Sequence, residues 1–281
     1  MMRPMTFQIH TLTSADGTAL HATWWEPDDG PAKAVVAHVH GLGEHSARHF
    51  HVARRLAAAG YAVGQIDLRG HGRSGGVRGN TSLPGAMDDI DALLADVAVR
   101  SPGLPVFLYG HSLGAMLVLN YALRRSPELA GVVVSSAGLR SPVLEQRVKM
   151  TAAKVLGRVL PWVAIPTGLD DSGLSRDPAV LEAYRADPFV HDKASLALGK
   201  DGAEGADYAL AHAAELHYPL LMIHGAADPI AYARGTEEFA GKVSGDVTVR
   251  IYDGLMHELH NEPEQDEILG EVVAWLDAHV G

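Results

Sequence analysis

The sequence contains no cysteine, so this chain can form no disulfide bond, thiolate nucleophile or cysteine-based metal site. Basic residues are also scarce, because 23 Lys and Arg stand against 34 Asp and Glu and give a formal net charge of −11. Proteins that bind nucleic acid need a basic surface to neutralise phosphates. We therefore expect no nucleic-acid partner.

Long apolar runs are absent as well. No stretch approaches the roughly 20 apolar residues that span a bilayer, and no apolar segment of a secretory signal follows the first residues. We therefore expect a cytoplasmic protein. The 281-residue chain is 47% hydrophobic and 20% charged, which is typical of globular proteins, and it can bury a substantial core as one large or two average domains. Its oligomeric state is not determined by the sequence.

What is present is a repeated strand–helix pattern. Residues 6–11 and 20–25 alternate around Asp16-Gly17 and predict a hairpin. Apolar runs typical of buried strands follow at 34–40, 61–67, 106–109, 131–136, 219–224 and 247–252. Helical patterns lie at 49–60, 84–100, 115–125, 232–242 and 264–280. This alternation predicts the α/β class, with a mostly parallel sheet and helices on both faces.

The pattern is interrupted once. Residues 139–216 show no strand rhythm and contain helical segments separated by Pro142, Pro161, Pro166, Pro178 and Pro188. We interpret this stretch as a helical cap inserted into the core. The predicted organisation is therefore a first part of the core at 1–138, the insertion at 139–216 and a second part of the core at 217–281.

A Gly-x-Ser-x-Gly pentapeptide, residues 110–114, joins the strand at 106–109 to the following helix. A bare pentapeptide is a weak signal, but between a strand and a helix it is the signature of a nucleophile elbow. In such a turn the serine is strained and exposed at the end of the sheet. Ser112 is therefore the predicted nucleophile.

A serine nucleophile needs an imidazole base and a carboxylate that orients the imidazole. Asp228 and His257 each follow a predicted strand, and the order Ser, Asp, His is that of α/β-hydrolases. Asp253 is an alternative acid and His260 an alternative base. We favour Asp228 because it follows its own strand and Pro229 restrains its backbone, and we expect His260 at the surface or around the site.

The oxyanion of such a reaction needs backbone N–H donors, one of them directly after the nucleophile. Leu113 and Leu42 are the predicted donors, because Leu42 lies in a glycine-rich turn directly after the strand at 34–40. The alternative for this turn is a plain structural loop. If only backbone groups act, Leu42→Ala is expected to keep most of the activity.

Sixteen histidines raise the question of a metal site. A His-Glu-x-x-His helix is missing, and so are clustered carboxylate partners, so we expect most histidines to be structural and no metal or organic cofactor. The glycine-rich segment 67–75 lacks the Walker pattern for phosphate binding. A tight structural loop beside the site is the preferred interpretation.

Seven motifs together resemble the monoacylglycerol lipase/lysophospholipase branch of the α/β-hydrolases. They are HGLGEHSAR (40–48), DLRGHGRS (67–74), GHSLG (110–114), SRDP (175–178), DPFVH (187–191), HGAAD (224–228) and HEL (257–259). The resemblance spans most of the chain and implies hydrolysis of a fatty acyl monoester of glycerol, through an acyl-enzyme on Ser112. It also implies that the insertion is a cap over the acyl pocket, so the expected partner is a small lipid ester.

The resemblance further implies that Glu44 and Arg48 lie near the polar head group of the substrate. The alternative is a structural i,i+4 ion pair worth a few tenths of a kcal/mol. The chain departs from the family at two positions: His49 stands where a tyrosine is common, and Ala115 where a second glycine often follows the elbow. These departures concern head-group selectivity and the fit behind the nucleophile.

The start of the insertion is basic, because residues 140–158 contain five Lys and Arg against the single acid Glu145. One hypothesis is that this segment contacts a lipid surface as a peripheral element. The alternative is an amphipathic helix that packs its apolar face on the core.

Other functions remain open at the level of sequence. A short-chain carboxylesterase or lysophospholipase is the first alternative, and a peptidase on a similar scaffold is the second. A ligand-binding protein without turnover is a different class, which loss of a triad residue would mark, and none is lost here. A dehalogenase is excluded because it would need an aspartate at position 112.

Overall fold

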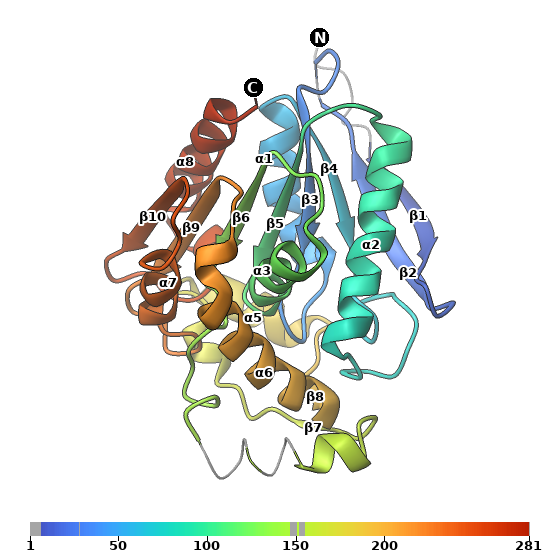
Figure 1. The fold of residues 1–281 in the computed structure, drawn as a ribbon, viewed down its shortest axis with the longest axis vertical. Helices are drawn as coiled ribbons and strands as arrows, with labels where there is room; N and C mark the ends of the chain where they lie inside the picture. Colours follow the sequence, from blue (N-terminus) through green and yellow to red (C-terminus); the bar gives the residue numbers. More distant parts are fainter. Residues whose placement is uncertain (1–6, 28, 147–150, 152–154, 281) are drawn as a thin grey trace.

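The structure is a computed structural model that describes residues 7–27, 29–146, 151 and 155–280. Its centre is an eight-stranded sheet with the order β1-β2-β4-β3-β5-β6-β9-β10 (Figure 1). The strands are β1 (Phe7–Thr13), β2 (Ala19–Trp25), β3 (Ala34–Val39), β4 (Tyr61–Ile66), β5 (Val106–His111), β6 (Gly131–Ser135), β9 (Leu220–Gly225) and β10 (Val247–Tyr252).

Only the first hairpin departs from parallel pairing. β1 and β2 pair antiparallel, as do β2 and β4, whereas every pairing from β4 to β10 is parallel. The predicted α/β fold with a mostly parallel sheet is confirmed. Because the carboxyl ends of parallel strands lie at one edge, the loops after β3, β5, β9 and β10 meet there.

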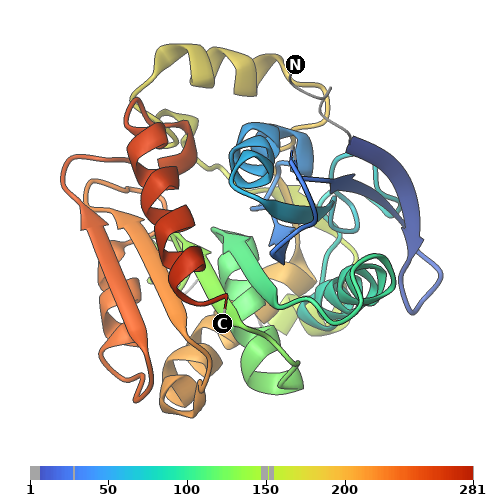
Figure 2. The same ribbon diagram turned by 90° about the horizontal axis from the view of Figure 1, so that it is seen from above.

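Helices cover both faces of this sheet (Figures 1 and 2). Helices α1 and α8 pack on one face, and α2, α3 and α7 pack on the other. Successive residues of a strand point to opposite faces of a sheet. In β5, Phe107 therefore belongs to the apolar cluster that includes α1 and α8, and Leu108 belongs to the cluster that includes α2, α3 and α7. The helices are α1 (Phe50–Ala58), α2 (Leu83–Arg100), α3 (Leu113–Arg125), α7 (Ala233–Ala240) and α8 (Gln265–Ala278).

The segment between β6 and β9 gathers at the end of the sheet toward which the parallel strands point (Figure 1). It contains α5 (Pro178–Ala186), α6 (Leu196–His212), short 3-10 turns, and the strands β7 (Ala164–Pro166) and β8 (Lys193–Ser195). β7 and β8 pair antiparallel, a short ladder within the mainly helical insertion that the sequence did not predict. The boundaries 139–216 of the cap stay a prediction.

The insertion meets the core through backbone contacts. The His191 N–H donates to the Gly43 carbonyl at 2.8 Å, and a Cβ atom on Gly43 would lie 2.2 Å from the His191 carbonyl oxygen. Gly43 also has φ +76, which side chains rarely allow. On the other side, the His257 and Glu258 N–H groups donate to the Gly173 and Leu174 carbonyls at 3.2 and 2.7 Å.

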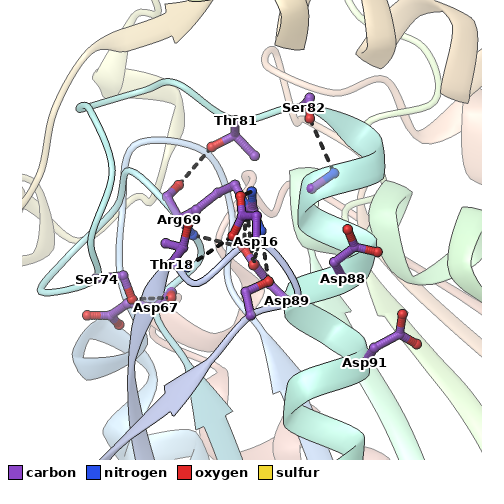
Figure 3. Close-up of polar contacts among 12 residues, drawn as sticks. Asp16, Thr18, Asp67, Arg69, Ser74, Thr81, Ser82, Asp88, Asp89 and Asp91 are labelled. Carbon is purple, nitrogen blue, oxygen red and sulfur yellow. Dashed lines mark hydrogen bonds and ion pairs between the residues drawn. The ribbon is translucent and has the colours of Figure 1, made fainter.

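The glycine-rich loop after β4 is held by one arginine (Figure 3). The Arg69 guanidinium forms a fork with the buried Asp89 carboxylate of α2, with a shortest contact of 2.7 Å. It also donates to Asp16 in the β1–β2 turn at 2.6 Å, and the Thr81 hydroxyl donates to the Arg69 carbonyl at 2.8 Å. This loop is therefore tied to both the hairpin and α2, as a structural loop requires.

Candidate active site

Ser112 lies in a sharp turn between β5 and α3. Its φ of +54 is strained for a residue with a side chain, and the Ser112 N–H donates to the Ser135 carbonyl at 2.9 Å. A Cβ atom on Gly114 would lie 2.2 Å from the Val39 carbonyl oxygen, so only glycine fits there. The strand, strained serine and close-packed glycine form the turn expected of a nucleophile elbow.

The structure brings three predicted residues together: Ser112 from the turn after β5, Asp228 from the loop after β9 and His257 from the loop after β10. His257 Nε2 lies 2.8 Å from the Ser112 Oγ, and His257 Nδ1 lies 2.7 Å from Asp228 Oδ2. In this arrangement Nδ1–H donates to the carboxylate and Nε2 can accept the serine proton. The alternative acid Asp253 is exposed to solvent.

Asp228 is fixed as an acceptor on both oxygens. Its Oδ1 accepts from the Ile230 and Ala231 N–H groups at 2.8 and 3.0 Å, and Oδ2 lies 3.1 Å from His224 Nε2. Burial alone raises the pKa of Asp228, but the charges and hydrogen bonds of His257 and His224 outweigh it and hold the pKa below its ordinary range. The carboxylate is therefore ionised and rigid.

The pKa of the predicted base, His257, depends on the same contacts. Burial lowers the pKa of His257, but the Asp228 carboxylate outweighs burial through its charge and hydrogen bond, and Glu258 and Glu44 add smaller effects in the same direction. The net result is a pKa above the ordinary 6.5. A more basic imidazole is better suited to remove the Ser112 proton and to stabilise the imidazolium that forms.

The predicted oxyanion donors flank Ser112. Leu113 is the first residue of α3, where a backbone N–H has no acceptor within the helix. Leu42 lies in the turn after β3 and lines the same cavity as Ser112. Their role as donors stays a prediction.

A narrow cavity of about 30 Å³ opens over Ser112. Its lining combines the core site with side chains of the insertion: Gly41, Leu42, Glu44, Arg48, His111, Ser112, Leu169, Leu174, Tyr184, Ile230, His257 and Glu258. Both predicted head-group residues are among them. The cavity therefore has a polar wall of two carboxylates and a guanidinium beside an apolar wall of leucine and isoleucine.

Glu44 and Arg48 form the i,i+4 ion pair that the sequence allowed, at 2.8 Å. The pair is nearly buried, so the small value expected for an exposed pair does not apply to it. Arg48 also forms a two-pronged contact with Glu258, at 2.7 and 2.8 Å. Sequence reasoning missed Glu258, although its position directly after His257 was a signal.

Buried histidines pack behind the site. His49 Nε2 lies 3.0 Å from Glu44 Oε1, and the His260 ring lies 4.3 Å from that of His49 and 4.7 Å from that of His111. His260 is thus buried around the site and not at the surface. Burial holds the pKa of His111 and His260 well below the ordinary value, so both rings are neutral. Among the described residues, no three His, Asp or Glu side chains are grouped as a metal site.

The outer surface of the insertion exposes apolar side chains. They are Val155, Leu156, Val159, Leu160, Trp162 and Ile165, exposed by 40 to 66%. For Val155, Leu156, Val159 and Leu160 the alternative of an apolar face packed on the core is wrong, whereas Leu144 does pack against the core. Of the basic residues, Arg140 pairs with Glu238, while Arg147, Lys149 and Lys154 lie outside the described residues. None of the helices in the described part of the chain is long and apolar enough to cross a membrane.

Comparison with known proteins places the chain in one group. Residues 30–264 match the family model "Serine aminopeptidase, S33". The chain is 36% identical to a protein named monoacylglycerol lipase from Mycolicibacterium smegmatis, with 96% of this chain and 97% of that protein covered. It is 33% identical to the monoglyceride lipase of Homo sapiens, with 94% and 89% covered.

A solved structure extends the likeness to three dimensions. The crystal structure of the Paleococcus ferrophilus monoacylglycerol lipase superposes with a TM-score of 0.86 at 35% sequence identity. The match covers 92% of this chain and 99% of that one. The likeness therefore includes most of the segment between β6 and β9 as well as the sheet.

Proposed function

This chain belongs to the serine aminopeptidase S33 family of α/β-hydrolases, and from this membership we propose that it hydrolyses monoacylglycerols to glycerol and fatty acid. The resemblance that the seven motifs indicated is confirmed, and so is the class of enzyme, a serine hydrolase of esters. The observation that supports the mechanism best is the continuous contact from Asp228 through His257 to the Ser112 hydroxyl.

Acylation begins when the Ser112 Oγ attacks the ester carbonyl carbon while His257 Nε2 takes the hydroxyl proton. The carbonyl oxygen becomes an oxyanion, which the Leu42 and Leu113 N–H groups stabilise. Collapse of this intermediate breaks the bond to glycerol, and His257 returns the proton to the leaving oxygen. The products of this half-reaction are glycerol and an acyl-enzyme.

Deacylation repeats the same steps with water. His257 takes a proton from the water molecule, whose oxygen attacks the acyl carbonyl carbon and forms a second oxyanion intermediate. The bond to Ser112 Oγ then breaks, His257 reprotonates the serine, and the fatty acid leaves. Asp228 stays ionised throughout and holds the imidazole in the productive tautomer.

We expect the insertion to move when the substrate enters. A cavity of about 30 Å³ holds one or two water molecules, whereas small-molecule sites usually measure roughly 300 Å³ or more. Leu169 and Tyr184 of the insertion line this cavity together with Ser112. We expect them to separate from the core when the acyl chain enters, with the glycerol end toward the polar wall.

The exposed apolar side chains of the insertion suit a lipid surface. Trp162 and Val159 are 60 and 66% exposed, and apolar area removed from water yields about 25 cal/mol per Å². A monoacylglycerol resides in micelles or membranes, so transient contact of this surface with lipid would place the cavity near its substrate. We include this peripheral contact in the proposal.

The test is a panel of initial rates of fatty acid release by wild type and by Ser112→Ala. The panel holds monoacylglycerols of short to long chain, a lysophospholipid, a triacylglycerol and short p-nitrophenyl esters. Preference for monoacylglycerols that vanishes in the variant is the expected result. Activity confined to short activated esters would leave a carboxylesterase, and a preference for the lysophospholipid would assign that class. No turnover that depends on Ser112 would favour a ligand-binding protein.

A further inference from the structure

Two loops of the site are joined by one arginine. The oxyanion loop, residues 40–45, contains Glu44, and the histidine loop, residues 253–258, ends in Glu258. Arg48 Nη1 donates to Glu44 Oε2 at 2.8 Å and to Glu258 Oε1 at 2.7 Å, while Nη2 donates to Glu258 Oε2 at 2.8 Å. Glu258 is 210 residues from Arg48 in sequence, so this contact joins two segments that are far apart in the chain.

The second oxygen of Glu44 reaches the backbone of the oxyanion loop. Glu44 Oε1 accepts from the Gly41 N–H at 2.6 Å and contacts His49 Nε2 at 3.0 Å. Gly41 immediately precedes Leu42, one of the two proposed oxyanion donors. A shift of the Glu44 carboxylate would therefore rotate or displace the peptide group next to that donor.

Every carboxylate oxygen of Glu44 and Glu258 already has a hydrogen-bond partner within the protein. Glu44 Oε1 already has two partners, and both Glu258 oxygens are engaged by the Arg48 fork. The Tyr184 ring covers the Arg48 guanidinium at 4.7 Å. Their contacts are thus made mainly within the protein, which favours a positioning role over direct binding of a head group.

Stability alone is a poor reason for this arrangement. Glu44 and Glu258 are 3 and 2% exposed and share a single guanidinium, and burying ions costs more than their attraction repays unless the geometry is good. The two carboxylates leave an excess negative charge beside His257, which forms a cation during the reaction. A charge of this sign at this place serves catalysis better than it serves folding.

We propose that Arg48 and Glu258 are positioning residues, which fix the oxyanion loop and the histidine loop relative to one another and place negative charge beside the His257 imidazole. The proposal rests on the proposed serine-hydrolase mechanism. It predicts two separable effects. The Arg48–Glu258 fork sets the distance between the oxyanion donors and the base, and the Glu258 charge favours the protonated imidazole.

The readout is the rate of Ser112 modification by an alkyl fluorophosphonate, followed against pH. In this reaction the Ser112 Oγ forms a bond to phosphorus, the phosphorus–fluorine bond breaks, fluoride leaves and His257 takes the hydroxyl proton. It needs the base and the oxyanion donors but no monoacylglycerol. It therefore tests the proposal even if the physiological substrate is a different ester.

Glu258→Gln removes the charge and half of the fork while keeping the shape of the side chain. We expect the plateau rate to fall about tenfold to a hundredfold, because small displacements of reacting groups have effects of this size. We also expect the acid limb of the pH profile to move to lower pH, since the Glu258 charge raises the pKa of His257 and the variant lacks that charge.

Glu258→Asp separates the two effects. It keeps the charge but shortens the side chain, so the plateau should fall while the acid limb stays at its wild-type pH. Arg48→Lys keeps one positive charge without the fork and should lower the plateau as well. These conservative variants maintain the test if Glu258→Gln fails to fold.

Asp89→Asn is the matched control, because Asp89 forms an equally buried fork with Arg69 away from the cavity (Figure 3). It should lower the unfolding midpoint and leave both the plateau and the acid limb unchanged. Plateau rates within twofold of wild type for both Glu258→Gln and Arg48→Lys would overturn the proposal. Normal modification by the fluorophosphonate without monoacylglycerol hydrolysis would instead overturn the proposed substrate.

Discussion

The two walls of the cavity differ in how their atoms are held. On the core wall, Ser112, His257 and Asp228 each have named hydrogen-bond partners at 2.7 to 2.9 Å. On the side of the insertion, Leu169 is 40% exposed, and other apolar side chains of the insertion are exposed to solvent as well. Hydrogen bonds thus hold the triad candidates in place, whereas the insertion contributes apolar side chains that are partly exposed to solvent.

This contrast suggests a division of tasks within one chain. Groups that exchange protons must stay within hydrogen-bonding distance through every step, so they lie on loops anchored by the sheet. An entrance for acyl chains must open and close, so few fixed polar contacts are an advantage there. Variants of the core wall should therefore change the chemical step, and variants of the insertion should change access.

Ser112→Ala should have the largest effect, since it removes the nucleophile and leaves only binding and the oxyanion donors. We expect kcat for ester hydrolysis to fall by about 10⁴-fold or more. Initial-rate measurements on a short p-nitrophenyl ester will check this, because that substrate makes little use of the insertion. A loss smaller than a hundredfold would mean that another residue performs the attack.

Asp228→Asn should come next. The amide cannot hold the His257 imidazole in the tautomer that accepts the serine proton, so we expect a loss of about 10³- to 10⁴-fold in kcat. The same assay applies, with circular dichroism to verify folding. Asp253→Asn is the control and should retain near wild-type activity, whereas a larger loss there would restore Asp253 as the acid.

The pH profile should show the state of the base. His257 must be neutral to take a proton, and its pKa lies above 6.5, so kcat/KM should reach half its plateau above pH 6.5. Below that point the rate should fall about tenfold per pH unit. An acid limb centred well below pH 6.5 in a Ser112-dependent assay would contradict the tuning by Asp228.

Exchange of exposed apolar side chains on the insertion should have a smaller and selective effect. We expect Trp162→Ser combined with Val159→Ser to lower the rate on micellar monoacylglycerol about threefold to tenfold. The reason is that the variant removes less apolar area from water when it binds the lipid surface. The rate on a soluble ester should not change. Val99→Ser on α2 is the control, since Val99 is 80% exposed away from the insertion.

Binding to lipid can be measured directly with the same variants. Co-sedimentation with vesicles should decrease for the double variant and stay at the wild-type level for Val99→Ser. Equal sedimentation of all three proteins would remove the lipid surface from the proposal while leaving the chemistry intact.

Leu42→Ala should have the smallest effect, because the proposed donor is the backbone N–H. We expect kcat/KM for a soluble ester to stay within about threefold of wild type, as alanine preserves that N–H. Steady-state kinetics will check this. A loss comparable to that of Ser112→Ala would show that the leucine side chain has a role of its own.

Much of the core could be predicted because its signals are local. The apolar run of β5 is followed by the pentapeptide around Ser112, and each remaining triad candidate follows its own strand. Parallel strands end at the same edge, so topology alone brings these residues into one region. The separate strand before Asp228 and the restraint from Pro229 then favoured Asp228 over Asp253.

The remaining features depend on contacts that no local pattern records. β7 and β8 have three residues each, too short for a strand period, and Pro166 argued against a strand. Glu258 meets Arg48 only because the loops after β3 and β10 converge, and His260 is buried by rings from distant segments. Such contacts become visible only once the chain is folded.

The hydrogen bonds between the insertion and the core limit how the cap can be exchanged. Gly43 accepts from the His191 N–H, and the His257 and Glu258 N–H groups donate to the carbonyls of residues 173 and 174. A cap transplanted from another enzyme would have to form these backbone hydrogen bonds to the core as well as its own pocket. Substrate range in this scaffold is therefore easier to change by single substitutions within the cap than by grafting a new one.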